Sequence, residues 1–301
     1  MVIAPLGENI SLQEATTSDN TLSVRPTILV FDSGVGGLSV YREVKKLIPN
    51  AHYIYAFDNE AFPYGEKSEE FIIDRVYQIV NAIAENHPLT IAIIACNTAS
   101  TVSLPNLRAH FTFPVVGVVP AIKPATKLTR NGVVGLLATK GTVNREYTKE
   151  LIERFATDCK VISLGSAELV QLAERKLHGE TLPLDEVAQT VRPWIRMPEP
   201  PDTVILGCTH FPLLIEELEK VLPNGTRFID SGSAIARRTV WLINNQEEIA
   251  SSEEENFAYC LLMDDNAKGL QPVLKAEGFK TLEKLAIQVK FDGKLSERKK
   301  I

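Results

Sequence analysis

Two cysteines lie in matching contexts, far apart in the chain. Cys96 follows the apolar run Ile91–Ala95, and Cys208 follows the run Val204–Leu206. Each run is typical of a buried strand, and each cysteine comes just before a predicted helix. The partial positive charge of a helix N-terminus favours a thiolate, so both side chains are candidate bases near neutral pH. In open α/β sheets, ligands bind beyond the carboxyl ends of the strands, where both cysteines are expected.

A single cysteine at a strand end is more often a packing residue than a catalytic one. The matched contexts of Cys96 and Cys208 reverse that balance, whereas Cys159 and Cys260 lack such neighbours and are predicted to be packing residues. The four cysteines form no CxxC pair and no Cys/His cluster with zinc-ligand spacing. We therefore expect free thiols and no metal site.

Polar residues near the cysteines could complete a site. His210 lies two residues after Cys208 and suits an acid/base partner, although a histidine satisfied at the surface is the alternative. Asp32 follows another predicted strand. It is either a simple helix cap or a group that holds the substrate ammonium or passes protons to and from Cys96.

Two loops are predicted to face a small ligand. The segment Asp32–Gly37 is rich in glycine but matches neither the dinucleotide-binding nor the Walker spacing, so we expect its backbone to approach a small molecule closely. The segment Phe62–Glu66 combines two aromatic residues with proline and glycine, which indicates an ordered turn that lines a cleft. The hydroxyls of Thr98 and Thr209 can bind carboxylate oxygens.

Strands and helices alternate around these residues. Strands are predicted at 27–31, 52–57, 90–95, 132–138, 159–163, 203–206 and 226–229, and helices at 37–48, 68–85, after 97, and at 143–155, 166–177, 212–221 and 234–244. This repetition predicts an α/β fold in which doubly wound parallel sheets are covered by helices on both faces.

The chain is long enough for two domains, with 301 residues of which 45% are hydrophobic and 23% charged. The last predicted helix could return to the first half, which would make the first domain discontinuous. We predict a first domain at 26–120 plus 231–288 and a second at 121–230. A flexible N-terminal extension at 1–25 and a frayed tail at 289–301 complete the division.

Charge and hydropathy exclude several classes of protein. A net charge of −6 argues against a chain built to bind nucleic acid. No apolar stretch is long enough to cross a bilayer, so no membrane partner is expected, and the first 25 residues lack the order of a secretory signal. We expect a cytoplasmic protein.

The sequence resembles the glutamate racemase family, within the aspartate/glutamate racemase superfamily, from about residue 27 to 287. The motifs that carry the resemblance are FDSGVGGLSV at 31–40, PYG at 63–65, ACNTAS at 95–100, GCTHFPLL at 207–214 and DSG at 230–232. The resemblance implies two flavodoxin-like domains related by pseudo-twofold symmetry, with the active site in the cleft between them. It implies that Cys96 and Cys208 are the catalytic bases. The residues that it places in contact with substrate are Asp32, Ser33, Tyr64, Gly65, Asn97, Thr98, Thr209 and His210.

Two further expectations come from the resemblance. The stretch SAELVQLAE at 166–174 stands where the family often reads CPLFVPLVE, so Glu174 takes the position of an auxiliary acid/base residue although the leading cysteine and proline are absent. The branch that the sequence resembles most includes members with an N-terminal extension that are activated by UDP-N-acetylmuramoyl-L-alanine. This precursor is therefore a candidate activator.

The activity that the resemblance implies is interconversion of L- and D-glutamate without a cofactor, which supplies D-glutamate for peptidoglycan. Cys96 would take the α-proton from D-glutamate and Cys208 from L-glutamate, with the opposite cysteine returning a proton. Rival hypotheses are an aspartate or hydantoin racemase with the same thiols, an amino-acid-binding protein without turnover, and a thiol redox protein. The sequence does not set an oligomeric state.

Overall fold

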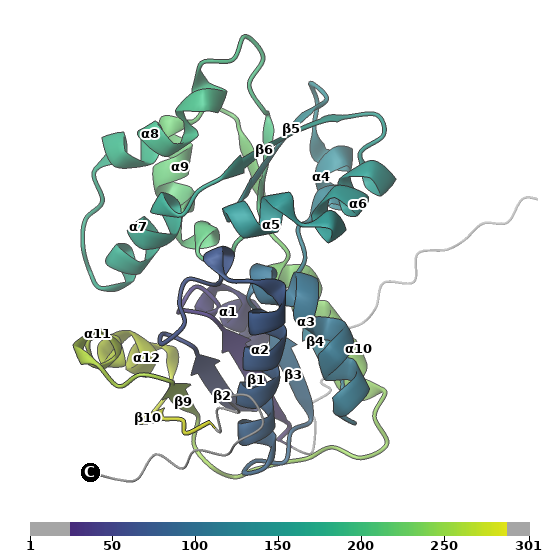
Figure 1. Ribbon diagram of the computed structural model, residues 1–301, viewed down its shortest axis with the longest axis vertical. Helices are drawn as coiled ribbons and strands as arrows, with labels where there is room; N and C mark the ends of the chain where they lie inside the picture. Colours follow the sequence, from purple (N-terminus) through teal and green to yellow (C-terminus); the bar gives the residue numbers. More distant parts are fainter. Residues whose placement is uncertain (1–24, 288–301) are drawn as a thin grey trace, which may run out of the picture.

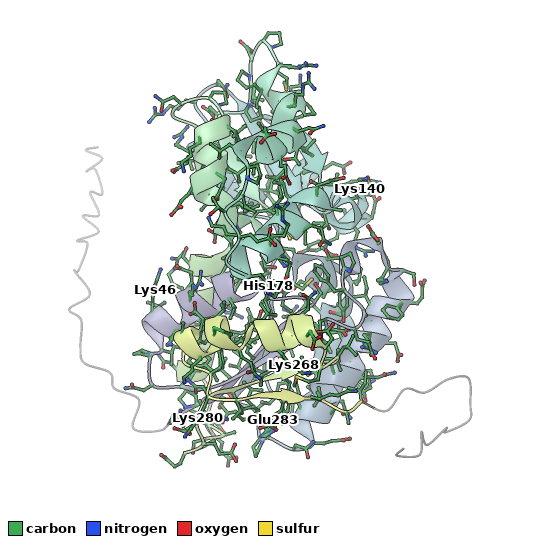
Figure 2. The ribbon with its side chains drawn as sticks, turned by 90° about the vertical axis from the view of Figure 1, so that its left-hand side faces the viewer. Lys46, Lys140, His178, Lys268, Lys280 and Glu283 are labelled. Atoms are coloured by element: carbon green, nitrogen blue, oxygen red, sulfur yellow. The ribbon has the colours of Figure 1, made fainter. Side chains whose placement is uncertain are left out.

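The computed structural model describes residues 25–287, which form two α/β halves, each built on a parallel sheet (Figure 1). The predicted extension, apart from Arg25, and the predicted tail lie outside these residues. Figure 2 shows from the side that the two halves are stacked along the long axis of the molecule. No helix within residues 25–287 combines the length and the apolar character that a bilayer span requires.

The first sheet has six strands in the order β10-β9-β2-β1-β3-β4. Its strands are β1 (Thr27–Asp32), β2 (His52–Phe57), β3 (Ile91–Ile94), β4 (Val115–Gly117), β9 (Phe257–Cys260) and β10 (Leu282–Lys284). The helices around it are α1 (Leu38–Leu47), α2 (Glu69–Ala84), α3 (Asn97–His110), α10 (Gly232–Asn244), α11 (Asp265–Gly269) and α12 (Gln271–Glu277), with a 3-10 turn η1 (Tyr64–Glu66).

The second sheet has four strands in the order β6-β5-β7-β8. Its strands are β5 (Val133–Ala138), β6 (Lys160–Gly165), β7 (Thr203–Leu206) and β8 (Arg227–Ile229). Around it lie α4 (Ile122–Leu128), α5 (Lys140–Asn144), α6 (Glu146–Phe155), α7 (Glu168–Leu177), α8 (Leu184–Ile195) and α9 (Ile215–Val221), with a 3-10 turn η2 (Phe211–Leu214).

Alternating side chains in the central strands explain why helices cover both faces of each sheet. In β1, Ile28 and Val30 enter one buried cluster, while Leu29 and Phe31 enter the cluster on the opposite face. In β5, Leu136 and Leu137 divide in the same way between the two clusters of the second sheet. The predicted doubly wound fold is confirmed, because both faces of each sheet are apolar and must be buried.

The chain crosses between the halves twice. It enters the second half between β4 and α4, and it returns between β8 and α10, which packs against α1. The two crossings are joined by a hydrogen bond that Ser231 Oγ donates to the carbonyl oxygen of Val119. The predicted domain boundaries stay a prediction, and the packing of α10 against α1 supports a discontinuous first domain.

Candidate active site

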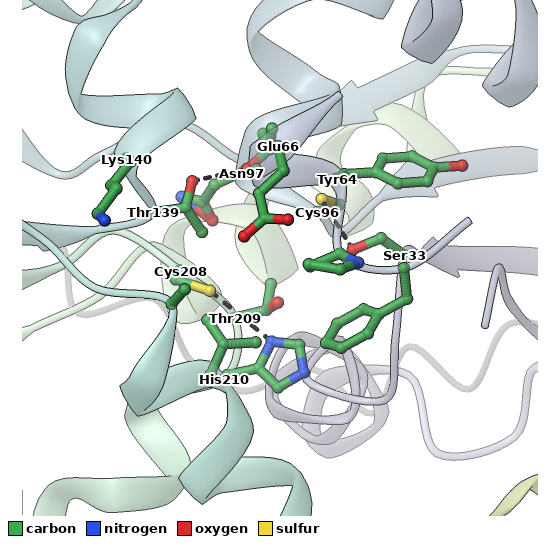
Figure 3. Close-up of a pocket in the computed structure, with 16 residues that line it drawn as sticks. Ser33, Tyr64, Glu66, Cys96, Asn97, Thr139, Lys140, Cys208, Thr209 and His210 are labelled. Atoms are coloured by element: carbon green, nitrogen blue, oxygen red, sulfur yellow. Dashed lines mark hydrogen bonds between the residues drawn. The ribbon is translucent and has the colours of Figure 1, made fainter. Parts of the chain in front are cut away.

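A narrow cavity lies where the carboxyl ends of the two sheets face each other, and both matched cysteines line it (Figure 3). The volume of the cavity is about 40 Å³. The first half contributes Ser33, Phe62, Pro63, Tyr64, Gly65, Glu66, Cys96, Asn97 and Thr98, and the second contributes Thr139, Lys140, Ala167, Val170, Cys208, Thr209 and His210.

Cys96 lies two residues after β3 and is the N-cap of α3. Its Sγ accepts a hydrogen bond from Ala99 N at 3.4 Å and lies 3.5 Å from Ser33 Oγ. Burial, together with the nearby Asp32 carboxylate, raises the pKa of Cys96 to about 12. Desolvation of the charged form therefore opposes the effect of the helix N-terminus at Cys96 and favours the thiol, and its role as a base stays a prediction.

Cys208 begins a chain of contacts with two other side chains. Its Sγ lies 3.7 Å from His210 Nδ1, and His210 Nε2 lies 2.6 Å from Glu174 Oε1. Burial alone would lower the pKa of His210, but its hydrogen bonds to Cys208 and Glu174 hold that pKa well above its usual range. Burial alone would raise the pKa of Glu174, yet the hydrogen bond to His210 keeps it below its usual value. An imidazolium thus lies beside Cys208, where it stabilises negative charge on the sulfur.

The helix expected directly after Cys208 starts later than predicted. Residues 211–214 form η2, and α9 begins only at Ile215. Pro212 occupies an early position of η2, where its missing N–H costs nothing, so the predicted helix at 212–221 divides into a 3-10 turn and a short α-helix. At Cys208 the positive charge next to the sulfur is therefore that of His210 rather than that of a helix N-terminus.

Asp32 lies behind the cavity wall and is fully buried. Its Oδ2 accepts hydrogen bonds from Gly37 N at 2.6 Å and from Thr209 Oγ1 at 3.2 Å, and its Oδ1 accepts one from Ser33 N at 2.9 Å. Burial raises the pKa of Asp32, although the charge of His210 and the backbone donors oppose that shift. Asp32 thus caps the turn before α1 and also links the two halves, which agrees with the helix-cap role. Contact with a substrate ammonium stays a prediction, because Asp32 does not line the cavity.

The glycines of segment 32–37 make room for side chains of the second half. A Cβ on Gly36 would lie 2.4 Å from His210 Nδ1, and a Cβ on Gly34 would lie 2.9 Å from Glu174 Oε1. Glu174 Oε1 also accepts a hydrogen bond from Val35 N at 3.3 Å. We expected these glycines to admit a small ligand, but in the structure they admit His210 and Glu174.

The predicted substrate contacts differ in what they present to the cavity. Thr98 Oγ1 lies 3.1 Å from the hydroxyls of both Thr139 and Thr142, across the boundary between the halves. Tyr64 lines the cavity with its ring only, because its hydroxyl donates to Asp58 Oδ2 at 2.7 Å. Ser33, Gly65, Asn97, Thr98, Thr209 and His210 are all in the lining, whereas Asp32 and Glu174 are not.

Four lining residues were absent from the expectations, namely Thr139, Lys140, Ala167 and Val170. A signal for the first two was present, because Thr139 and Lys140 follow directly after strand β5, as the cysteines follow β3 and β7. Ala167 also lies just after a strand, β6, but Ala167 and Val170 are apolar and carry no chemical signal. Among residues 25–287 there is no group of three His, Cys, Asp or Glu side chains that could hold a metal ion.

Comparison with known proteins agrees with this geometry. A family model for Asp/Glu/Hydantoin racemases matches residues 28–239. The chain is 66% identical over 280 residues to the glutamate racemase of Serratia proteamaculans, which covers 93% of this chain and 98% of that protein. It is also 66% identical over 288 residues to the glutamate racemase of Proteus mirabilis, with 95% of this chain and all of that protein covered.

Solved structures give the same result. The crystal structure of Escherichia coli glutamate racemase with L-glutamate and the activator UDP-MurNAc-Ala has a TM-score of 0.86 and 65% identity, and covers 87% of this chain and 99% of that one. The glutamate racemase isoform RacE1 of Bacillus anthracis has a TM-score of 0.71 at 28% identity, with 86% and 96% covered. The resemblance found in the sequence is confirmed, and the chain belongs to the Asp/Glu/Hydantoin racemase family.

Proposed function

We propose that the protein is a glutamate racemase, which interconverts L- and D-glutamate by moving the α-proton between Cys96 and Cys208. The observation that carries the proposal is that two thiols, one from each half, line the same buried cavity. The relatives that share about two thirds of its residues are glutamate racemases, and the Escherichia coli structure contains L-glutamate.

The α-hydrogen of an amino acid is only weakly acidic, so its removal needs a site that stabilises the developing carbanion. A buried cavity strengthens every electrostatic interaction within it and excludes water. Asn97, Thr98 and Thr209 supply polar groups for the carboxylates of the substrate. Racemisation also needs a base on one face of the α-carbon and an acid on the other, which two thiols from opposite halves supply.

The surroundings of the two sulfurs suggest a role for each. Cys208, beside the His210 imidazolium, removes the α-proton of L-glutamate, and the electron pair of that C–H bond stays on the carbon. The Cys96 thiol, whose pKa is raised to about 12, then gives its proton to the opposite face and becomes a thiolate. The reverse reaction starts from this second state, with Cys96 as the base and Cys208 as the acid. Glu174 holds His210 in place through its hydrogen bond, and the charge of Asp32 helps to keep Cys96 protonated.

The proposal includes three further points. The enzyme supplies D-glutamate for peptidoglycan, a role that fits the name glutamate racemase carried by its relatives. It acts in the cytoplasm, because free thiols such as those of Cys96 and Cys208 persist in a reducing compartment. It is activated by UDP-MurNAc-Ala, as the Escherichia coli enzyme is described; an unchanged kcat on addition of this compound would remove that point.

The test is a circular dichroism assay of purified protein with L- or D-glutamate and no added cofactor. Each enantiomer should lose ellipticity until the mixture is racemic. L-aspartate and a hydantoin serve as competing substrates in parallel assays. Absence of turnover with glutamate, or faster turnover with a competitor, would contradict the proposal.

A further inference from the structure

Two side chains of opposite charge line the catalytic cavity, one from each half of the molecule. Glu66, in η1 of the first half, and Lys140, at the start of α5 of the second half, both line it, and both are exposed (Figure 3). The backbone fixes their positions, because the seam between η1 and α5 is tightly packed. A Cβ on Gly141 would lie only 2.7 Å from the carbonyl oxygen of Gly65.

Lys140 is the only lysine or arginine among the lining side chains. The other cation of the lining, the His210 imidazolium, is paired with Glu174 at 2.6 Å. Lys140 has no such pairing with a described residue. The pKa of Glu168 on α7 is lowered mainly by hydrogen bonds from its own backbone and from Ser166, and the charge of Lys140 makes only a minor contribution. The positive charge of Lys140 is therefore available to a ligand at the mouth.

An amino acid with a second carboxylate has a net charge of about −1, and the protein itself carries a net charge of −6. The overall field of the protein therefore opposes entry of such a substrate, and a local cation at the mouth counteracts it. Resting on the function proposed above, we infer that Lys140 is a specificity-determining residue, which selects amino acids that carry a second carboxylate. The negative charge of Glu66, on the other side of the cavity, lowers the affinity for a second carboxylate.

The experiment measures binding rather than turnover. Glutarate and its monoamide have nearly the same shape, but only glutarate carries the second negative charge. Isothermal calorimetry at low salt gives the ratio of their affinities. Lys140→Gln should lower that ratio by about two- to five-fold, the range for one exposed charge, and Lys140→Arg should keep it. Glu66→Gln should raise it.

Lys220→Gln on α9 is the matched control, because it removes the same charge from an exposed lysine of the second half that does not line the cavity. The difference between wild type and Lys140→Gln should shrink in about 1 M salt, where the screening length is short. An unchanged ratio in Lys140→Gln, or an equal fall in Lys220→Gln, would overturn the inference.

Kinetics separate this inference from the proposed function. In Lys140→Gln, KM for L-glutamate should rise by the same factor as the binding ratio falls, and kcat should stay within about two-fold because no reacting atom is touched. A wild-type protein that binds glutarate but does not racemise glutamate would remove the proposed function alone. A wild-type racemase whose preference for two carboxylates survives Lys140→Gln would remove the inference alone.

Discussion

Gly36 offers a sharp test of how the site is assembled. In Gly36→Ala the new Cβ would lie 2.4, 2.7 and 2.8 Å from three atoms of the His210 ring. Relief to an ordinary contact of about 3.4 Å requires a displacement of about 1 Å, and His210 is only 2% exposed, so the ring has little space to move into. A displacement of that size disrupts the contact of His210 Nδ1 with Cys208, the hydrogen bond between Nε2 and Glu174, or both.

The expected cost is a fall in kcat/KM of about 100-fold, as for other misplacements of about 1 Å in a catalytic group. The circular dichroism assay measures it with L- and D-glutamate, and the fall must be equal in the two directions because the equilibrium constant of a racemisation is one. Overpacking should also lower the free energy of unfolding by about 1–3 kcal/mol.

Two other glycines calibrate this result. In Gly34→Ala the new Cβ meets a carboxylate oxygen of Glu174 at 2.9 Å, at the end of a longer side chain, so we expect a smaller loss. In Gly269→Ala the new Cβ meets only His178 at 3.4 Å, an ordinary contact, so we expect wild-type kinetics. Wild-type kcat/KM in Gly36→Ala, or equal losses in all three variants, would refute the reasoning.

Three more predictions follow from the site and from the second sheet. Cys96→Ala and Cys208→Ala should each abolish racemisation, and near-normal turnover in either variant would contradict the two-thiol mechanism. In D2O the wild-type enzyme should place deuterium at the α-carbon of the newly formed enantiomer, which mass spectrometry measures. Tyr64→Phe removes a hydroxyl that donates to Asp58 rather than facing the cavity, so KM for glutamate should change by less than about two-fold while urea unfolding shows a loss of about 1–2 kcal/mol; a large rise in KM would show that the hydroxyl contacts substrate. Burial of Asp202 raises its pKa, but hydrogen bonds from Thr129 and from the backbone of residues 130 and 131 prevail and lower that pKa to about 2, below its unfolded value. The ionised Asp202 therefore stabilises the fold at a pH above the pKa that it has in the unfolded chain, and this stabilisation is lost as the pH falls towards 2. Asp202→Asn should lower the free energy of unfolding by about 1 kcal/mol at pH 7. An equal loss near pH 2 would contradict this prediction.

The sequence was sufficient for the elements in which one local signal is strong. The apolar runs before Cys96 and Cys208 predicted two buried strands with their cysteines at the carboxyl ends, and β3 and β7 are found there. The sequence did not predict the strands after Asn244, because β9 and β10 are short and only partly buried and so lack a long apolar run. The single helix predicted at 143–155 is two helices that meet at Arg145, whose backbone is extended.

The electrostatics of the site depended on contacts that no local pattern encodes. The ion pair of His210 and Glu174 joins residues 36 positions apart through packing of η2 against α7. The raised pKa of Cys96 comes mainly from burial, which depends on contacts between segments far apart in the chain. The helix N-terminus at Cys96 was predicted correctly, but the size of the opposing desolvation could not be judged from the sequence.

The two connections between the halves are joined by the hydrogen bond between Ser231 and Val119, and together they restrict how the halves can move relative to each other. Two connections that lie side by side resist twisting and sliding of the halves more than a single connection would. The movement that they oppose least is a swing about the line that they define, and the contacts across the seam, such as that of Gly141 with Gly65, must open for it to occur. One cysteine lies in each half, so a swing of this kind would change the distance between the two sulfurs.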